Sequence, residues 1–422
     1  MINYEDTYAQ PLILAALKSR LPPGSYTLIS SITELPDQSS PFLQIGAYES
    51  LPFPHILSHP ATTLANAYII RKALIRKHYL SATAFNWITK NPSSTLATNI
   101  KPACDFELDY AEFLDEALVE AWELRESFER NKGKESHDRE WWILKPGMSD
   151  RGQGIRLFST EEDLQSIFEE WEANRPDSDD EGEEENENRK AEETEKNAEG
   201  DGDYIVTSHL RHFIAQPYIH PPLLLASNPR KFHIRTYVLA VGALKVYVYK
   251  QMLALFSSTA YLPPWSPPTS DTATDLSPHL TNTCLQPSVH DGTVQLFFSL
   301  PLSDLSTSMK DNIFKQICDT TGEAFEAAAK GMMVHFQVLP NVFEVFGVDF
   351  LVDEAGRAWL LEVNAFPDFR QTGEELRDVV GGLWEGVVDV AIRSFFGLEL
   401  KGKEKEEASD MVLVREVNIG KR

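Results

Sequence analysis

The chain has 422 residues, more than one ordinary domain holds, so we expect two or three lobes. Its composition is that of a globular protein, with 42% hydrophobic and 10% aromatic residues, and its formal net charge is −25. Residues 174–203 hold fourteen acidic and four basic residues, and the remainder of the chain is still acidic. This charge argues against general electrostatic binding to nucleic acid or to an anionic membrane.

The three cysteines show no metal-like spacing, which suggests a reducing compartment. The chain does not open on a basic stretch followed by an apolar one, and no apolar run is long enough to span a bilayer. We therefore expect a cytoplasmic protein with no membrane partner.

Two helices are predicted in the first third of the chain, because apolar residues recur at helical spacing over residues 63–79 and 110–130. The polar side of the first helix carries a basic cluster formed by Arg71, Lys72, Arg76 and Lys77. This cluster either faces solvent or meets an acidic partner, and the sequence leaves both interpretations open.

A strand, a glycine-containing loop and a second strand are predicted over residues 141–158. Lys145 ends the first strand, where its charge can reach a phosphate, and the loop contains Arg151, Gly152 and Gly154. Glycines let backbone amides approach phosphate oxygens. The loop matches neither the Walker nor the Rossmann spacing, so an ordinary hairpin turn is the alternative.

Two further strands follow the acidic stretch. The first ends in Gln216-Pro-Tyr218-Ile219, which could offer backbone groups to the edge of an adenine ring. The second carries Lys231, His233 and Arg235, spaced by two and therefore on one face. Three such side chains repel unless they meet an anion, so the strand predicts either an anion site or an exposed basic strand.

The segment Phe346-Gly-Val-Asp349 to Glu362-Val-Asn364 is the most informative of the chain. It predicts two apolar strands around a tight turn at Ala355-Gly356. A two-residue turn places Asp349 directly across from Glu362, and Asn364 shares the face of Glu362. Converging oxygen ligands of this kind suit Mg²⁺, which proteins hold by one or two carboxylates together with phosphate oxygens. A surface hairpin with solvated polar residues is the alternative.

These segments together resemble the tubulin-tyrosine-ligase family of the ATP-grasp superfamily, over roughly residues 62–395. The resemblance is carried by five motifs in the same order: Trp-Ile-Leu-Lys145-Pro with Arg151-Gly-Gln-Gly-Ile, Gln216-Pro-Tyr-Ile, Arg230-Lys-Phe-His-Ile-Arg-Thr-Tyr-Val-Leu, His279-Leu-Thr-Asn, and Gly347-Val-Asp-Phe with Leu-Leu-Glu362-Val-Asn. It implies a mixed α/β (α+β) ATP-grasp fold in which two lobes clamp a nucleotide, with a preceding N-terminal domain.

The resemblance also implies roles for single residues. Mg²⁺ would be bound by Asp349, Glu362 and Asn364, and ATP would be bound by Lys145, Arg151, Gly152, Gly154, Gln216, Tyr218, Ile219, Lys231, Thr281 and Asn282. Arg235 would hold an acyl phosphate, with His233 beside it. The implied reaction activates a carboxylate as an acyl phosphate, and an amine then attacks it to join an amino acid to a protein or peptide, with tubulin as one candidate acceptor.

Two departures concern the acceptor side. The family usually has aspartate where this chain has His233, and often arginine where this chain has Leu255. These departures resemble a fungal branch of the family that is associated with mRNA-decay granules (P-bodies). The alternative to a ligase is therefore an ATP-binding interaction module that docks a partner of the mRNA-decapping machinery.

The expected organisation has four parts. Residues 1–100 form an N-terminal domain, 101–210 a central lobe with a disordered acidic insertion at 174–203, 211–400 a C-terminal lobe with a Pro-rich insertion at 262–278, and 401–422 a charged tail.

Overall fold

The computed structural model describes residues 1–4, 6–147, 153–173, 211–267, 276–281, 293–398 and 410–418. None of the helices in these ranges has the length and apolar character that a bilayer span needs. The acidic insertion at 174–203 and residues 268–275 of the Pro-rich insertion lie outside the described residues.

Contacts divide the chain into two compact units. The first consists of Met1–Pro102, Ile219–Pro263 and Asp275–Arg422, and the second of Ala103–Tyr218 and Pro264–Thr274. We expected residues 1–100 to form a separate N-terminal domain. They instead share a unit with most of residues 211–400, the segment of the expected C-terminal lobe.

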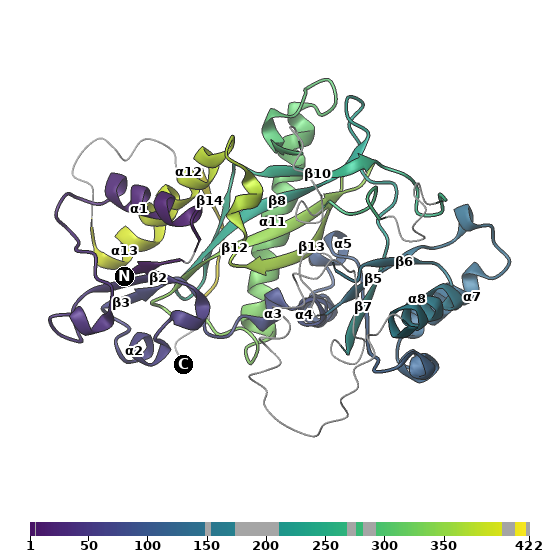
Figure 1. The fold of residues 1–422 in the computed structure, drawn as a ribbon, viewed down its shortest axis with the longest axis horizontal. Helices are drawn as coiled ribbons and strands as arrows, with labels where there is room; N and C mark the ends of the chain where they lie inside the picture. Colours follow the sequence, from purple (N-terminus) through teal and green to yellow (C-terminus); the bar gives the residue numbers. More distant parts are fainter. Residues whose placement is uncertain are drawn as a thin grey trace. The chain divides into compact units, whose positions relative to one another are not determined.

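A seven-stranded antiparallel sheet forms the centre of the first unit (Figure 1). Its strands are β8 (Arg230–Val241), β9 (Lys245–Tyr249), β10 (Leu253–Ala260), β11 (Val294–Leu296), β12 (Phe343–Val352), β13 (Ala358–Ala365) and β14 (Met411–Glu416). The order is β11-β10-β8-β12-β13, and β9 pairs with both β8 and β14. Strand β14 lies in the segment that we expected to be a charged tail.

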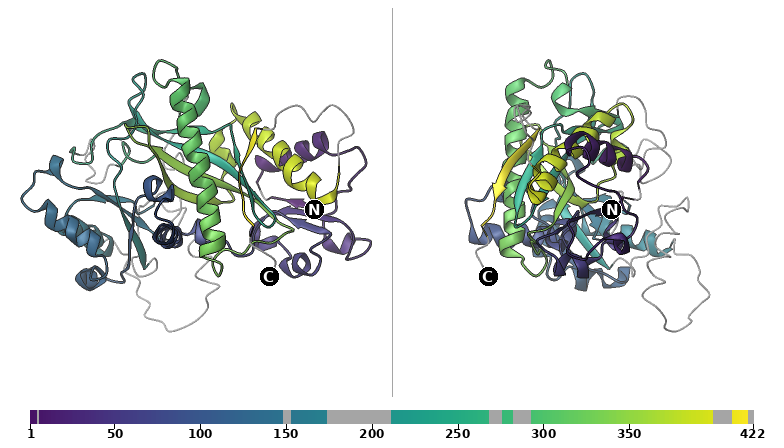
Figure 2. Two further views of the ribbon diagram at one scale, coloured as in Figure 1. Left: turned by 180° about the vertical axis from the view of Figure 1, so that it is seen from behind. Right: turned by 90° about the vertical axis from the view of Figure 1, so that its left-hand side faces the viewer.

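Helices cover both faces of this sheet, as the two views in Figure 2 show. The long helix α11 (Thr307–Gly331) packs on one face, where Phe325 meets Phe346 of β12. Helices α1 (Ala9–Arg20) and α12 (Arg377–Val387) pack on the other face with Leu239 of β8. The central strands β8 and β12 are therefore buried on both sides, which explains their nearly continuous apolar sequences.

The rest of the first unit consists of a small parallel sheet and short helices. The sheet has the order β1 (Ile2–Asn3), β2 (Phe42–Gly46) and β3 (Thr63–Ala65). The helices are α2 (Phe53–Ser58), α3 (Lys72–Ile75), α4 (Lys77–Lys90), α5 (Leu96–Asn99) and α13 (Arg393–Phe396), the last joined to α12 by a π-helical turn, Val388–Ile392.

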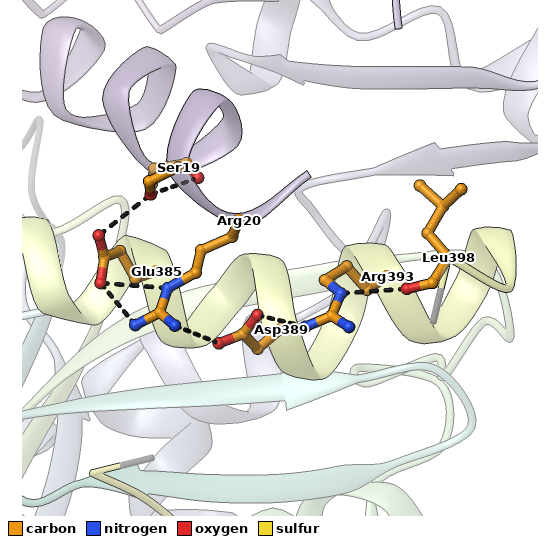
Figure 3. Close-up of polar contacts among 7 residues, drawn as sticks. Ser19, Arg20, Glu385, Asp389, Arg393 and Leu398 are labelled. Atoms are coloured by element: carbon orange, nitrogen blue, oxygen red, sulfur yellow. Dashed lines mark hydrogen bonds and ion pairs between the residues drawn. The ribbon is translucent and has the colours of Figure 1, made fainter. Parts of the chain in front are cut away.

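Ion pairs tie α1 to the C-terminal helices (Figure 3). Arg20 donates to Glu385 at 2.8 and 3.2 Å and lies 3.8 Å from Asp389. Ser19 also donates to Glu385, and Asp389 accepts from Arg393. Segments more than 360 residues apart in the sequence are thus joined at a partly exposed surface.

The second unit has a four-stranded sheet in the order β4 (Cys104–Glu107), β7 (His212–Pro217), β5 (Trp142–Pro146) and β6 (Arg156–Phe158). Its helices are α6 (Leu114–Ala117), α7 (Trp122–Asn131) and α8 (Glu161–Ala173). Phe168 of α8 and Phe213 of β7 lie in its apolar core with their ring centroids 5.0 Å apart.

Two helix predictions were wrong in part. Residues 63–79 form a strand and two helices, because β3 pairs with β2 and because the backbone leaves helical geometry at Arg71 and Arg76. Residues 110–130 are split into α6 and α7. In both segments tertiary pairing and packing override a helical sequence pattern.

Candidate functional site

The hairpin of β12 and β13 places Asp349 opposite Glu362, as predicted. The turn is not the two-residue turn that we expected. The amide of Asp353 donates to the carbonyl of Arg357 at 3.0 Å, which leaves a three-residue loop in which Gly356 has a φ of +80°. A β-bulge at Leu361 adds one residue to β13 and restores the predicted register.

The three predicted metal ligands lie together at this point of the hairpin. The side-chain amide of Asn364 is 3.3 Å from Oδ2 of Asp349 and 3.1 Å from Oε1 of Glu362. Asp349 is only 4% exposed, so the alternative of a solvated surface hairpin is wrong at this residue. Two carboxylates and an amide thus face one another, with the amide bridging the carboxylates.

The basic face of β8 is buried rather than exposed. Lys231, His233 and Arg235 are 6%, 4% and 8% exposed. Arg235 donates to both carboxylate oxygens of Asp349, through Nε at 2.5 Å and Nη2 at 3.0 Å. Burial alone would lower the pKa of Arg235, but the charge and the hydrogen bonds of Asp349 raise it above its ordinary value. The anion opposite this strand is therefore a carboxylate of the neighbouring strand.

His233 lies beside this ion pair. Its Nδ1 is 2.6 Å from the hydroxyl of Thr281, and its Nε2 is 3.5 Å from Oδ1 of Asp349 without forming a hydrogen bond. Burial lowers the pKa of His233, with Asp349 raising it and Arg235 lowering it. A neutral imidazole is favoured. Leu255 of β10, 1% exposed, pairs directly with His233 and belongs to an apolar cluster.

Lys77 at the start of α4 belongs to the same group, and the sequence did not identify it as a site residue. Its Nζ lies 3.8 Å from Oε2 of Glu362. The available signal was the basic cluster at residues 71–77, for which the sequence left open a solvated helix face or contact with an acidic partner. Lys77 instead lies beside an acidic residue of its own chain, and contact with a partner stays a prediction.

The remaining described site residues belong mostly to the second unit. Lys145 on β5 donates to Oε1 of Gln216 on the adjacent strand β7 at 2.9 Å. Gly154 has a φ of +71°, a conformation that favours glycine. Tyr218 is buried in this unit, whereas Ile219 belongs to the first unit and packs on Leu351 and Trp359. Arg151, Gly152 and Asn282 lie outside the described residues.

The donor set of the hairpin fits Mg²⁺. Among the described ranges no group of three or more His, Cys, Asp or Glu side chains gathers as a metal site. The predicted set has only two carboxylates, and the amide of Asn364 adds a third oxygen-bearing side chain within hydrogen-bond distance of both. Mg²⁺ is commonly held by this few protein ligands when phosphate oxygens complete its shell.

Comparison with a solved structure identifies the class of protein. The C-terminal domain of Pby1 from K. lactis, described as an ATP-grasp enzyme interacting with the mRNA decapping enzyme Dcp2, is 35% identical to this chain. The match has a TM-score of 0.69 and covers 99% of this chain and 98% of that one. The fold is therefore the expected mixed α/β ATP-grasp fold.

Sequence comparison identifies the family. The profile of the tubulin-tyrosine ligase family matches residues 76–397. A probable tubulin–tyrosine ligase of Schizosaccharomyces pombe is 44% identical over 94% of this chain and 91% of its own length. Probable tubulin–tyrosine ligase PBY1 of Saccharomyces cerevisiae is 42% identical over 93% of this chain, which spans 51% of that relative. The chain belongs to the tubulin-tyrosine ligase family, and the predicted resemblance to its fungal members is confirmed.

Proposed function

We propose that this chain binds Mg-ATP at the hairpin of β12 and β13 and uses it to join an amino acid to a protein or peptide carboxylate. The observation that carries the proposal is the convergence of Asp349, Glu362 and Asn364 in a chain of this family. In the reaction, a carboxylate oxygen attacks the γ-phosphorus and ADP leaves. The amine then attacks the acyl carbon, and phosphate leaves with loss of a proton.

The chain's own residues supply binding and charge neutralisation in this proposal. Asp349, Glu362 and Asn364 would hold the metal, which neutralises phosphate charge when bound. Arg235 and Lys231 place positive charge on the same face of β8, where an acyl phosphate would need it. His233, kept neutral by burial, would act as a hydrogen-bonding group rather than as a second cation. Lys145, Gln216 and the other second-unit residues stay predictions for nucleotide binding.

Calorimetry with Mg-ATP tests the pocket. Glu362→Gln keeps the shape of the side chain and removes one metal-binding charge, so we expect Mg-ATP affinity to fall at least tenfold. Glu354→Gln is the matched control, because Glu354 is an exposed carboxylate on the turn of the same hairpin. Equal affinities of the two variants, or no binding by the unmodified chain, would remove the metal assignment.

The chemistry needs a separate experiment. The chain is incubated with Mg-ATP, labelled amino acids and candidate acceptors, including tubulin, and both label transfer and ADP release are measured. Transfer that is lost in Arg235→Lys supports the ligase, because lysine lacks the planar fork of donors. ATP binding without label transfer or acceptor-dependent ADP release would contradict the ligase.

A second candidate is an ATP-binding module that docks a partner of the mRNA-decapping machinery in the cytoplasm. Two observations favour it. Leu255 places an apolar side chain directly opposite His233, where the family often has arginine. The similar domain of K. lactis Pby1 is described as interacting with Dcp2. Titration with a purified decapping enzyme tests this reading, and absence of binding at micromolar concentrations would count against it.

A further inference from the structure

Arg71 and Glu344 form a buried ion pair in the first unit that the proposed function does not yet use. Arg71 is 9% exposed and Glu344 is 1% exposed, and Nε of the arginine lies 2.9 Å from Oε1 of the glutamate. The other carboxylate oxygen accepts from the amide of Tyr68 at 3.0 Å. A buried charge is costly unless it is paired in this way. Arg71 was expected on the polar side of a helix, so its burial needs an explanation.

The pair fixes the conformation of the chain just before α3. The guanidinium of Arg71 donates back to the carbonyl of Tyr68 at 3.3 Å and lies 3.9 Å from the ring centroid of Tyr48. The hydroxyl of Tyr48 in turn donates to the carbonyl of Ile69 at 2.7 Å. Glu344 and Tyr48 therefore hold residues 68–71 from two directions.

This segment leads directly to Lys77. Helix α3 begins at Lys72 and has only four residues, Arg76 is extended, and α4 begins at Lys77. A four-residue helix offers little room to correct an error in its starting direction. The conformation at Arg71 therefore sets where Lys77 lies, and Lys77 lies 3.8 Å from Glu362.

The other end of the pair belongs to the strands of the metal site. Glu344 lies on β12, the strand of Asp349. The guanidinium of Arg71 also lies 5.7 Å from the ring centroid of Phe366, which follows Asn364 by two residues and has a φ of +49°. One ion pair thus contacts strand β12, the residue that directly follows β13, and the segment that leads to Lys77.

From this geometry we infer that Arg71 and Glu344 are a positioning pair that sets Lys77 against Glu362 and thereby shapes the charge around the metal ligands. The inference rests on the proposed Mg-ATP site for its functional consequence. The inference also has a structural half, which is that Arg71 controls the conformation of residues 72–77. This half concerns the ligand-free protein and can be tested without any measurement of nucleotide binding.

Hydrogen exchange of the ligand-free protein tests the structural half. Arg71→Gln removes the guanidinium, and Lys72→Gln is the matched control, because Lys72 is the next residue, equally charged, and exposed. The amides of Leu74, Ile75 and Arg76 donate to the carbonyls of residues 71 and 72. We expect their exchange to accelerate at least tenfold in Arg71→Gln and less than twofold in Lys72→Gln. Equal exchange in the two variants would overturn the inference, whatever the outcome for ATP.

Mg-ATP affinity tests the functional half by a double-mutant cycle. We expect Arg71→Gln to weaken binding at least fivefold, Lys72→Gln less than twofold, and Arg71→Lys to recover part of the loss. If Arg71 acts through Lys77, adding Arg71→Gln to Lys77→Gln changes affinity less than twofold. If adding Arg71→Gln to Lys77→Gln still weakens Mg-ATP affinity fivefold, Arg71 acts through a general structural effect and not through Lys77. That result would overturn the positioning role. If Glu362→Gln does not alter Mg-ATP affinity, the proposed function is overturned instead. The hydrogen-exchange rates then still decide whether Arg71 controls the conformation of residues 72–77.

Discussion

Replacing Asp349 by asparagine should destabilise the protein even without nucleotide. The substitution removes the counter-charge of Arg235, and the two side chains are only 6% and 9% exposed. Removing one member of a buried ion pair leaves an uncompensated charge and costs about 3–5 kcal/mol. The free energy of unfolding of Asp349→Asn should fall by that amount.

The chain contains a matched control in Glu385, which also accepts two hydrogen bonds from one arginine, Arg20 (Figure 3). These side chains are 36% and 29% exposed, so solvent screens the pair. Exposed pairs contribute about 0.2–1 kcal/mol, and Glu385→Gln should cost no more than that.

Urea unfolding compares the free energy of unfolding of both variants with that of the unmodified chain. The midpoint concentrations can be compared directly if the dependence of that free energy on urea concentration is unchanged. The reasoning is refuted if Asp349→Asn and Glu385→Gln differ by less than about 1 kcal/mol, because the burial of the first pair is then without consequence.

Two further outcomes are expected. Leu255→Arg, which introduces the arginine common in the family, should lower the free energy of unfolding by more than about 3 kcal/mol, because it places a charge in an apolar cluster. Urea unfolding measures this change, and a variant as stable as the unmodified chain would contradict the prediction. Lys145→Gln should weaken Mg-ATP binding in calorimetry about tenfold or more, a change of at least 1.4 kcal/mol, and an unchanged affinity would remove Lys145 from the site.

The hairpin shows what its sequence could and could not predict. The assumption of a two-residue turn placed Asp349 opposite Glu362, and this pairing is confirmed although the turn itself is different. The loop length was wrong by one residue, and the bulge at Leu361 compensated for it. Neither feature has a local signal, since the bulge depends on what packs against both strands.

The basic cluster at residues 71–77 shows a different limit. Four cations at helical spacing predict a polar helix face, yet Arg71 is buried against a residue 273 positions later in the sequence. The helix prediction failed for the same reason, because Arg71 adopts a non-helical backbone where it turns toward Glu344. Long-range ion pairs of this kind cannot be inferred from periodicity.

The pairing of opposite charges explains how this face of the sheet is stable. Lys231, His233 and Arg235 would repel one another on a bare strand, and so would Asp349 and Glu362 across the hairpin. The register of β8 against β12 sets Arg235 beside Asp349, and Asn364 lies between the two carboxylates. The charge of Arg235 is therefore balanced by Asp349 on a neighbouring strand, and the two carboxylates are bridged by the amide of Asn364. Charges that would repel one another on each strand alone thus form a paired, buried network in the sheet. In the proposed function, the same charges would bind a metal and its phosphates.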